Sequence, residues 1–293
     1  MYKRQILSYA ASKSKKINAN VAILGDFYDT VYKDGQIDAR LQQRAYNFFY
    51  EHFTPNTLFL LPGNHDMYNG YQESALTVFS SVATVYDSPT IDGHGILWLP
   101  YRDGGYSKSM VRKWKREGAK ICFTHNDFKY ICTRKNHIST EGMDPSIFDG
   151  FTVYNGHYHY PNECQNVICM GSQYAIHKTE TFDQKNLYTV AISKNKEFKY
   201  SHEPIRFGRR EFIYSLDYAE DLYENYWLPY IKNKESNVVP PPTYPTVQDT
   251  LIIEYTGNAS VGASVGAEVF FPLLKCFFVF RKVNETSKME IES

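Results

Sequence analysis

Four short apolar runs, each followed at once by a cluster of polar residues, constrain this fold more than any other feature. The runs are residues 21–24, 58–61, 121–123 and 151–154, and the clusters that follow them are 25–29, 63–66, residue 125 and 156–159. Runs of this length and composition are typical of buried strands. In open α/β folds the carboxyl ends of neighbouring strands meet at one edge of a sheet. The sequence therefore predicts an α/β fold with the four clusters gathered at one edge.

The residue types in these clusters are those that bind divalent metals. Asp26 has two carboxylate oxygens and is able to bridge two cations, and Asn64 supplies an amide oxygen. His125, His157 and His159 supply imidazole nitrogens. Mixed nitrogen and oxygen ligands suit Mn²⁺, Fe²⁺ or Zn²⁺ better than Mg²⁺. We predict two divalent ions, with Mn²⁺ favoured, because a metal pair clamps a phosphate and generates hydroxide at neutral pH.

Three further residues of the clusters are expected to support the metal ligands. His65 follows Asn64 directly, so we expect it to act on the phosphate, where an imidazolium stabilises charge or protonates the leaving group. Asp29 and Asp66 are expected to orient ligands or loops rather than to bind metal. Taken singly, each of these residues is equally well explained as an ordinary turn residue. Their occurrence together, in this order and after apolar runs, favours a metal site.

In these motifs the chain resembles the calcineurin-like metallophosphoesterase superfamily, whose motifs run D-x-H, GDxxD, GNHD or GNHE, a lone His, and GHxH. All but the first are present in order, as GDFYD, GNHD, a lone His and GHYH. The resemblance implies a βαβ sandwich of two mixed sheets flanked by helices. It implies that Asp26 bridges the two metals. Asn64, His125 and His157 would complete one metal site. His159 would contribute to the other.

The chain departs from the family pattern at its start. No Asp-x-His precedes Gly25; residues 1–5 are expected to be a non-native start, and residues 6–16 are predicted to form a helix. We therefore expect a fragment that lacks its first strand, which would leave neighbouring strands with open edges. One metal would keep only Asp26 and His159 as ligands. The end of the chain also shows no amphipathic helix for docking a partner, a second sign of truncation.

Segments 85–90 and 169–174 narrow the resemblance to SbcD-type DNA exonuclease subunits and their phage recombination-endonuclease relatives. This implies a metal-dependent DNA phosphodiester hydrolase, an exo- or endonuclease subunit that works with an SbcC-type ABC ATPase and is a homodimer at full length. One alternative is a calcineurin-like phosphatase or phosphodiesterase acting on nucleotides or other small phosphoesters. A second alternative is a non-catalytic fragment.

Charge and composition are compatible with an enzyme that acts on DNA. The formal net charge is zero, from 32 basic and 32 acidic residues, but residues 102–135 contain ten Lys or Arg against three acidic residues. A basic helix over 107–117 is most simply a solvated face, and a contact to the DNA backbone is the alternative. No apolar run reaches the roughly 20 residues of a membrane span, and five cysteines without CxxC spacing do not suggest a disulfide framework. We expect a cytoplasmic protein of a bacterium or a phage-infected host, with no membrane partner.

The pattern of elements predicts two domains. Residues 6–205 are expected to form the nuclease domain, and residues 206–293 a small α/β capping domain with a proline-rich loop at 237–245. Helices are predicted at 6–16, 37–52, 72–81, 107–117, 217–234 and 263–274; strands at 20–24, 57–61, 83–86, 95–99, 119–124, 151–155, 250–255 and 276–283. Segments 166–170, 187–193 and 197–202 are expected to finish the second sheet of the sandwich.

Overall fold

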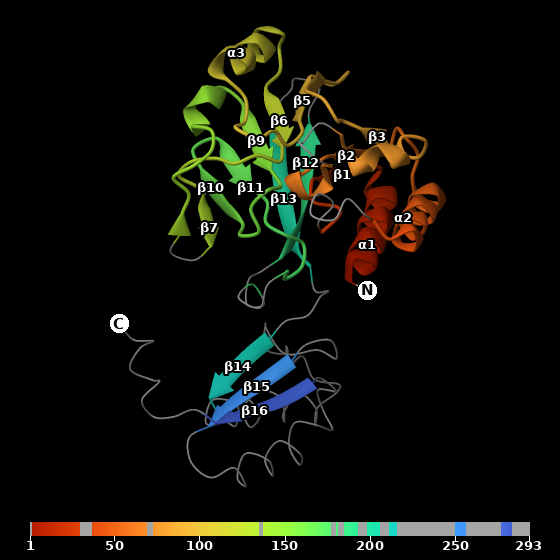
Figure 1. Cartoon of the computed structure of the whole chain (residues 1–293), viewed down its shortest axis with the longest axis vertical. Coiled ribbons are helices and arrows are strands. Elements are labelled where there is room, and N and C mark those ends of the chain that lie inside the picture. The colour runs from red at the N-terminus through yellow and green to blue at the C-terminus, as the bar shows by residue number, and fades with distance from the viewer. Residues whose placement is uncertain are drawn as a thin grey trace. The chain divides into compact units, whose positions relative to one another are not determined.

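The computed structural model shows a mixed α/β protein (Figure 1). It describes residues 2–29, 37–68, 73–134, 137–176, 180, 185–192, 198–205, 211–215, 250–255 and 277–282. The chain divides into two compact units, Met1–Gln173 with Lys185–Ile205, and Tyr174–Gln184 with Arg206–Ser293. Every residue predicted for the site lies in the first unit.

The first sheet is parallel and has the order β1-β2-β3. Its strands are β1 (Val21–Leu24), β2 (Leu58–Leu61) and β3 (Thr84–Val85). Leu58, Leu60 and Leu61 of β2 are fully buried because this strand lies between two others. Strand β1 is at the end of the sheet, so it pairs with β2 on one side alone among the described strands.

Two helices accompany this sheet. Helix α1 (Tyr2–Ile17) extends beyond the predicted 6–16 and includes residues 2–5. Helix α2 (Ala39–His52) begins where the Asp38 side chain accepts a hydrogen bond from the second helical residue, and it buries Phe48 and Phe49 in a cluster with the leucines of β2. Aromatic side chains supply large apolar area, so this contact anchors α2 against the sheet.

The second sheet has six strands in the order β10-β11-β9-β6-β5-β4. They are β4 (Thr90–Ile91), β5 (Ile96–Leu99), β6 (Ile121–Thr124), β9 (Thr152–Asn155), β10 (Asn162–Cys164) and β11 (Val167–Cys169). The four central strands are parallel and the two end strands are antiparallel. The sequence predicts the central strands from their apolar runs, whereas β4 and β10 are too short to show a pattern.

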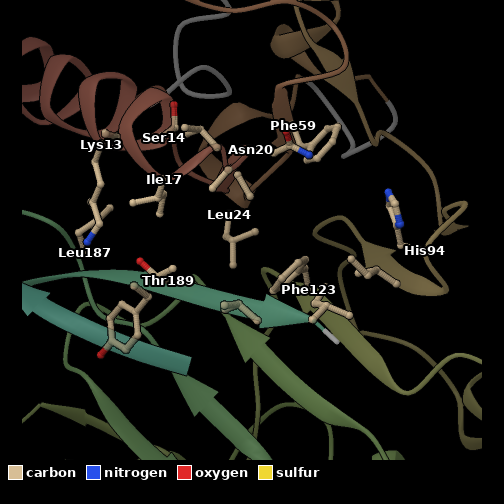
Figure 2. Close-up of a pocket in the computed structure, with 18 of the residues that line it drawn as sticks. Lys13, Ser14, Ile17, Asn20, Leu24, Phe59, His94, Phe123, Leu187 and Thr189 are labelled. Atoms are coloured by element: carbon tan, nitrogen blue, oxygen red, sulfur yellow. The ribbon is translucent and has the colours of Figure 1, made fainter. Parts of the chain in front are cut away.

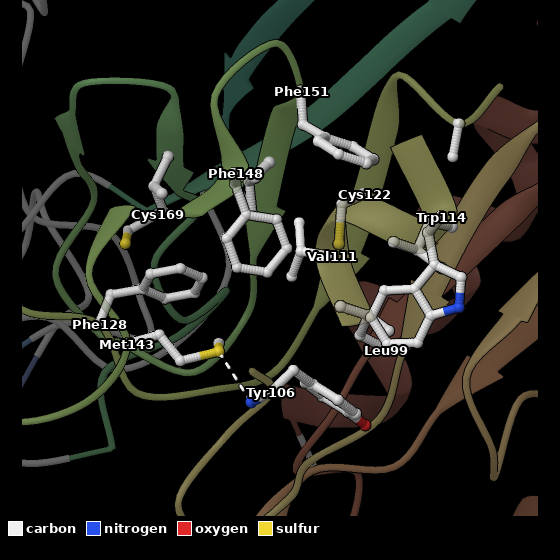
Figure 3. Packing of buried hydrophobic residues seen from close by; sticks show 14 of the residues in the cluster. Leu99, Tyr106, Val111, Trp114, Cys122, Phe128, Met143, Phe148, Phe151 and Cys169 are labelled. Atoms are coloured by element: carbon white, nitrogen blue, oxygen red, sulfur yellow. Dashed lines mark hydrogen bonds between the residues drawn. The ribbon is translucent and has the colours of Figure 1, made fainter. Parts of the chain in front are cut away.

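Helix α3 (Lys108–Arg116) is the predicted basic helix, and it packs against the second sheet. Ser107 caps its N-terminus, and Val111 and Trp114 point into the core while the lysines and arginines stay exposed. Figure 3 shows these side chains with Phe148 in the same cluster. Burial of one face therefore positions the helix and leaves its charged face in solvent.

Strands β12 (Asn186–Ile192) and β13 (Phe198–Pro204) form a two-stranded sheet of their own. The expectation that segments 187–193 and 197–202 finish the second sheet is therefore wrong, while segment 166–170 supplies β11 as expected. The two strands follow each other closely and pair antiparallel, a local arrangement that costs little chain entropy. Alternation of apolar and polar residues does not indicate whether an edge strand of a hairpin pairs with a strand of another sheet.

Other elements complete the described parts of the chain. They include β7 (Cys132–Arg134) with β8 (His137–Ile138), and the parallel strands β14 (Glu211–Ser215), β15 (Thr250–Tyr255) and β16 (Phe277–Lys282) of the second unit. The predicted helix at 72–81 is a short 3₁₀ helix, Ala75–Phe79. The helices predicted at 217–234 and 263–274 and the loop at 237–245 lie outside the described residues. Among the described helices, none is long and apolar enough to cross a membrane.

Candidate metal centre

The turn after β1 brings Asp26 against His125. Gly25 has a φ of 90° and Asp26 a φ of 54°, both in the left-handed region. A Cβ on Gly25 would lie 2.0 Å from His125 Nδ1, so no other residue fits. Non-glycine residues adopt this conformation at a cost, and such strain is common at functional sites. The geometry of the turn is therefore set by the approach of the histidine ring.

Two further glycines permit equally close approaches. A Cβ on Gly63 would lie 2.2 Å from Asp26 Oδ1, and a Cβ on Gly156 would lie 1.9 Å from the Leu24 carbonyl oxygen. Glycine at these positions lets three strand ends meet without a side chain between them. The three turns after β1, β2 and β9 are thereby packed backbone to backbone.

Four polar side chains converge where these turns meet. His125 Nε2 lies 3.1 Å from Asp26 Oδ2, 3.2 Å from Asn64 Oδ1 and 3.1 Å from His157 Nδ1. The ligand atoms of Asp26, His125 and His157 all lie within 4.8 Å of one another. The structure therefore brings together four of the five residues predicted to bind metal.

The hydrogen-bond partners of the two histidines fix which nitrogens face the cluster. His125 Nδ1 donates to the Leu24 carbonyl oxygen at 2.7 Å, and His157 Nε2 donates to Asp127 Oδ1 at 2.9 Å. The remaining nitrogens, His125 Nε2 and His157 Nδ1, are then directed at the centre. With the oxygens of Asp26 and Asn64, these two nitrogens form a compact set of four donor atoms of the kinds that bind divalent cations.

In the absence of a metal, a proton takes that position. Burial raises the pKa of Asp26, but the charge and hydrogen bond of His125 outweigh burial and hold this pKa at about 2. Burial lowers the pKa of His125, and the Asp26 carboxylate more than reverses this, so the pKa of His125 is raised. The pair therefore retains a proton on His125 and a negative charge on Asp26. A divalent ion that displaces this proton meets preformed ligands.

Asp127 supports His157 from outside the cluster, and sequence reasoning did not assign it a role. Its hydrogen bond to His157 lowers the pKa of Asp127. Burial raises this pKa by less, so the pKa stays below its ordinary value. Burial lowers the pKa of His157. A carboxylate that accepts the outer N–H of a ligand histidine fixes the ring and raises its basicity. The spacing His-x-Asp after an apolar strand was the available signal.

Asp66 is fully buried and binds the backbone of two loops. Its carboxylate accepts backbone N–H groups of Gly63 at 2.9 Å, Tyr28 at 2.8 Å and Phe27 at 3.3 Å. Burial raises the pKa of Asp66 to about 6 despite these bonds. The side chain thus ties the turn after β1 to the turn after β2.

His65 lies next to the cluster without belonging to it. Its backbone N–H donates to Asp26 Oδ1 at 3.1 Å, and its ring Nδ1 contacts the carbonyl oxygen of Asp29. Asp29 thus meets His65 through its backbone, and its side chain is exposed. The His65 backbone is thus held against Asp26, and its ring against the loop that follows β1.

His159 is outside the group of ligand atoms that lie within 4.8 Å of one another. Its carbonyl oxygen accepts hydrogen bonds from the Ser172 backbone at 3.0 Å and from Lys185 Nζ at 3.3 Å. These contacts fix the backbone of the GHYH turn. A metal role for the His159 ring stays a prediction.

Two buried asparagines link the loops that carry His125 and His157. Asn155 Oδ1 accepts from the Asn126 and His157 backbones, and Asn155 Nδ2 donates to the Asn126 carbonyl oxygen. Asn126 in turn accepts the backbone N–H of Arg102 at 3.1 Å. Both side chains are fully buried and satisfied, which is the usual condition for buried amides. Sequence reasoning missed them because a lone Asn at a strand end resembles any turn residue.

Two tyrosines have their rings near His157 of the cluster. Tyr158 is buried and its hydroxyl bonds both the N–H and the carbonyl oxygen of Phe128, so stacking on a nucleotide base is excluded for this residue. The ring of Tyr101 lies 6.2 Å from the His157 ring. Tyr101 is therefore one of two aromatic side chains beside the cluster, since the Tyr158 ring lies 5.0 Å from the His157 ring.

The donor set fits one divalent cation of the nitrogen- and oxygen-binding type. Two imidazole nitrogens, a carboxylate and an amide oxygen match the ligands of Mn²⁺, Fe²⁺ and Zn²⁺. A scan against family models finds no family that matches the chain. A search of curated proteins likewise finds no match.

Proposed function

We propose that this chain is a metal-dependent phosphodiester hydrolase of the metallophosphoesterase type, with DNA as its substrate. The observation that carries the proposal is the convergence of Asp26, Asn64, His125 and His157 from four strand ends upon one position. Burying a carboxylate, an amide and two imidazoles together is costly for stability, so a structural purpose explains this cluster poorly. Two divalent ions, with Mn²⁺ favoured, remain part of this proposal.

The metal at this position would polarise a phosphate oxygen and lower the pKa of a bound water. The residues of the chain have separate tasks around it. Asp127 holds the His157 ring in the tautomer that presents Nδ1, and Leu24 does the same for His125 through its carbonyl oxygen. His65, whose backbone N–H donates to Asp26, would act on the substrate as an imidazolium and protonate the leaving oxygen.

The proposal of a polyanionic substrate is supported by positive charge near the centre. The backbone of Arg102 is bound to Asn126, the residue after His125, and the Arg102 side chain is exposed with its guanidinium 5.6 Å from the Tyr106 ring. Helix α3 follows in the chain and presents Lys108, Arg112 and other basic side chains to solvent. A basic face of this kind binds a phosphate backbone without reading its sequence.

The test compares two substrates in the presence of Mn²⁺. We expect release of labelled fragments from duplex DNA, and loss of this activity in His157→Ala and on treatment with a chelator. His202→Ala, on β13, is the matched control because it removes a histidine from the same unit without touching the cluster. Hydrolysis of a chromogenic small phosphodiester without any action on DNA would replace the DNA proposal by the small-ester alternative. No Mn²⁺-dependent hydrolysis of either substrate would contradict the proposal.

A further inference from the structure

A cavity of about 650 Å³ lies beside β1 and β12, and it is not the opening of the candidate metal centre. None of the four converging side chains lines it. Figure 2 shows Leu24 and Phe123 in this cavity, with Ile17 of α1 above them. A phosphate chain would lose hydration against such apolar side chains. A phosphodiester substrate is therefore expected to approach the centre from another side.

The candidate metal centre is open to solvent on the side of Asp26 and His157. The Asp26 side chain is 22% exposed and the His157 side chain 18%, whereas that of His125 is fully buried. Asp127, which binds the outer nitrogen of His157, is 48% exposed. The Tyr101 ring lies 6.2 Å from the His157 ring. The loop that carries Tyr101 therefore borders the side from which a substrate reaches the centre.

This loop, residues 100–106 between β5 and α3, is tied to two turns that carry candidate ligands. Tyr101 donates its N–H to the Pro62 carbonyl oxygen at 2.9 Å, in the turn after β2. Arg102 donates its N–H to Asn126 Oδ1 at 3.1 Å, in the turn after β6. The backbone at Arg102 thus has a fixed position relative to the cluster.

The rest of the loop is anchored in the core of the second sheet. The hydroxyl of buried Tyr106 donates to the Pro100 carbonyl oxygen at 2.9 Å, and Gly105 donates its N–H to the Arg102 carbonyl oxygen at 2.8 Å. A Cβ on Gly105 would lie 2.5 Å from Met143 Cγ, so the backbone packs directly on that side chain. Figure 3 shows Tyr106 beside Met143 in this core. The loop is therefore a rigid support for the Arg102 side chain.

The Arg102 side chain is exposed, and its guanidinium is oriented by two weak contacts. Its Cζ lies 5.6 Å from the centre of the Tyr106 ring, and its Nη1 lies 3.9 Å from Met110 Sδ. A guanidinium has five N–H donors in one plane, and the sulfur contact uses one of them. Arginine binds phosphate through pairs of such donors. The group is therefore held in place while most of its donors face solvent.

We propose that Arg102 is a substrate-positioning residue that binds the phosphate next to the scissile one on an extended phosphodiester chain. The inference rests on the proposed function, because it requires a phosphodiester at the metal centre. A DNA strand has a neighbouring phosphate for Arg102 to bind, and a small phosphodiester has none. Arg102 would therefore select the polymer over the small ester.

A structural role explains the Arg102 side chain less well. The hydrogen bonds that fix the loop come from backbone groups, from Asn126 and from the Tyr106 hydroxyl. All of them survive replacement of the guanidinium, which contributes only the ring contact and the long sulfur contact. A substitution at Arg102 consequently tests phosphate binding with little effect on folding.

The test measures binding and hydrolysis separately. A fluorescent duplex of about 20 base pairs, titrated by anisotropy with a chelator present, gives the affinity at several salt concentrations without hydrolysis. Arg102→Gln should weaken binding about tenfold, as expected for a lost charge-assisted hydrogen bond. It should also lower the slope of log Kd against log salt concentration by about 0.9, the value for one phosphate contact. With Mn²⁺, the ratio of kcat/KM for DNA to kcat/KM for a chromogenic small phosphodiester should fall about tenfold.

Two further variants separate charge from geometry and place from total charge. Arg102→Lys keeps the charge and loses the planar fork, so its salt dependence should match the unaltered protein while its affinity lies between those of the unaltered protein and Arg102→Gln. Arg44→Gln removes an exposed arginine from α2 and is the matched control. Equal weakening by Arg44→Gln would show that total charge, and not the position of Arg102, determines DNA binding.

The outcomes distinguish this inference from the proposed function. Hydrolysis of DNA with an unchanged salt slope in Arg102→Gln would reject the role of Arg102 and keep the proposed function. An equal loss of kcat/KM for DNA and for the small ester would also reject it, because Arg102 would then not act on a neighbouring phosphate. No Mn²⁺-dependent hydrolysis by the unaltered protein would reject the proposed function and the positioning role together.

Discussion

At the scale of single residues, each side chain in the candidate centre has a distinct physical task. Asp26 and His125 form an ion pair at 3.1 Å. Asp127 and Leu24 determine which ring nitrogens of His157 and His125 face the centre. The sequence points to Asp26, Asn64, His125 and His157 because each lies shortly after the end of an apolar strand. The role of Asp127 does not, because it depends on a contact with a residue 30 positions away.

Asp127→Asn should weaken Mn²⁺ binding by about 10–100-fold, because the amide supports the His157 ring less well than a carboxylate. Isothermal titration calorimetry measures this. Asp87→Asn, which alters an exposed carboxylate away from the centre, serves as the control. Equal affinities for Asp127→Asn and the unaltered protein would show that the contact with His157 does not support the metal.

Metal binding should release a proton and strengthen as the pH rises. The raised pKa of His125 means that the metal-free protein holds a proton on this ring, which a divalent ion must displace. The affinity should therefore increase with pH until His125 is deprotonated in the free protein, and then level off. Calorimetric titrations with Mn²⁺ in buffers of different ionisation enthalpy count the released protons. A binding enthalpy that is the same in every buffer would contradict this prediction.

His65→Ala should keep its Mn²⁺ affinity and lose turnover, since the His65 ring lies beside the cluster and its backbone N–H, which binds Asp26, survives the substitution. A loss of about 10²–10⁴-fold in kcat is typical when a general acid is removed. His157→Ala should lose both metal and turnover. Loss of metal from His65→Ala would show that the two roles have been assigned wrongly.

At the scale of elements, the site depends on turns that have no room for side chains. Gly25, Gly63 and Gly156 let the ends of β1, β2 and β9 approach, and the Asp66 carboxylate joins the first two turns. The sequence predicts the strands because they are apolar and buried. It does not predict that β12 and β13 pair only with each other among the described strands, because register and edge choice depend on contacts distant in sequence.

Gly156→Ala should destabilise the protein by about 1–3 kcal/mol and weaken metal binding, because its Cβ would overlap the Leu24 carbonyl oxygen. Gly93→Ala is the matched control, since a Cβ there has no neighbour within 4 Å. Urea denaturation compares the two. Equal free energies of unfolding for the two variants would mean that the turns are less closely packed than the structure shows.

Asp66→Ala should cost about 1–3 kcal/mol in the metal-free protein, because three backbone N–H groups lose their acceptor. The pKa of Asp66 is raised from 3.8 to about 6 on folding, so its protonated form favours the folded state. That contribution is present below about pH 4 and is lost as the pH rises through about 6. The cost of Asp66→Ala should therefore be larger near pH 4 than near pH 8, as urea denaturation at the two pH values will show. A larger cost at the higher pH would contradict the assigned shift.

At the scale of the whole molecule, the chain has two units and the candidate centre is confined to one of them. The four converging residues come from positions 26–157, and their hydrogen-bond partners, such as Leu24 and Asp127, lie in the same unit. The sequence indicates the α/β class because apolar runs alternate with helical segments.

Removal of residues 206–293 should leave the Mn²⁺ affinity within about threefold of the intact chain, since no residue of the cluster lies there. Such a change corresponds to less than about 1 kcal/mol in binding free energy. A loss of metal binding in a shortened protein that keeps its circular dichroism spectrum would show that the second unit contributes to the centre.

The proposed chemistry depends most on a cation bound where the four side chains meet. Crystals of the protein soaked in Mn²⁺ and measured at the manganese absorption edge locate the ion directly. We expect an anomalous peak within coordination distance of Asp26 Oδ2, Asn64 Oδ1, His125 Nε2 and His157 Nδ1. A protein saturated with Mn²⁺ that shows no peak there, or a peak bound to other residues, would contradict it.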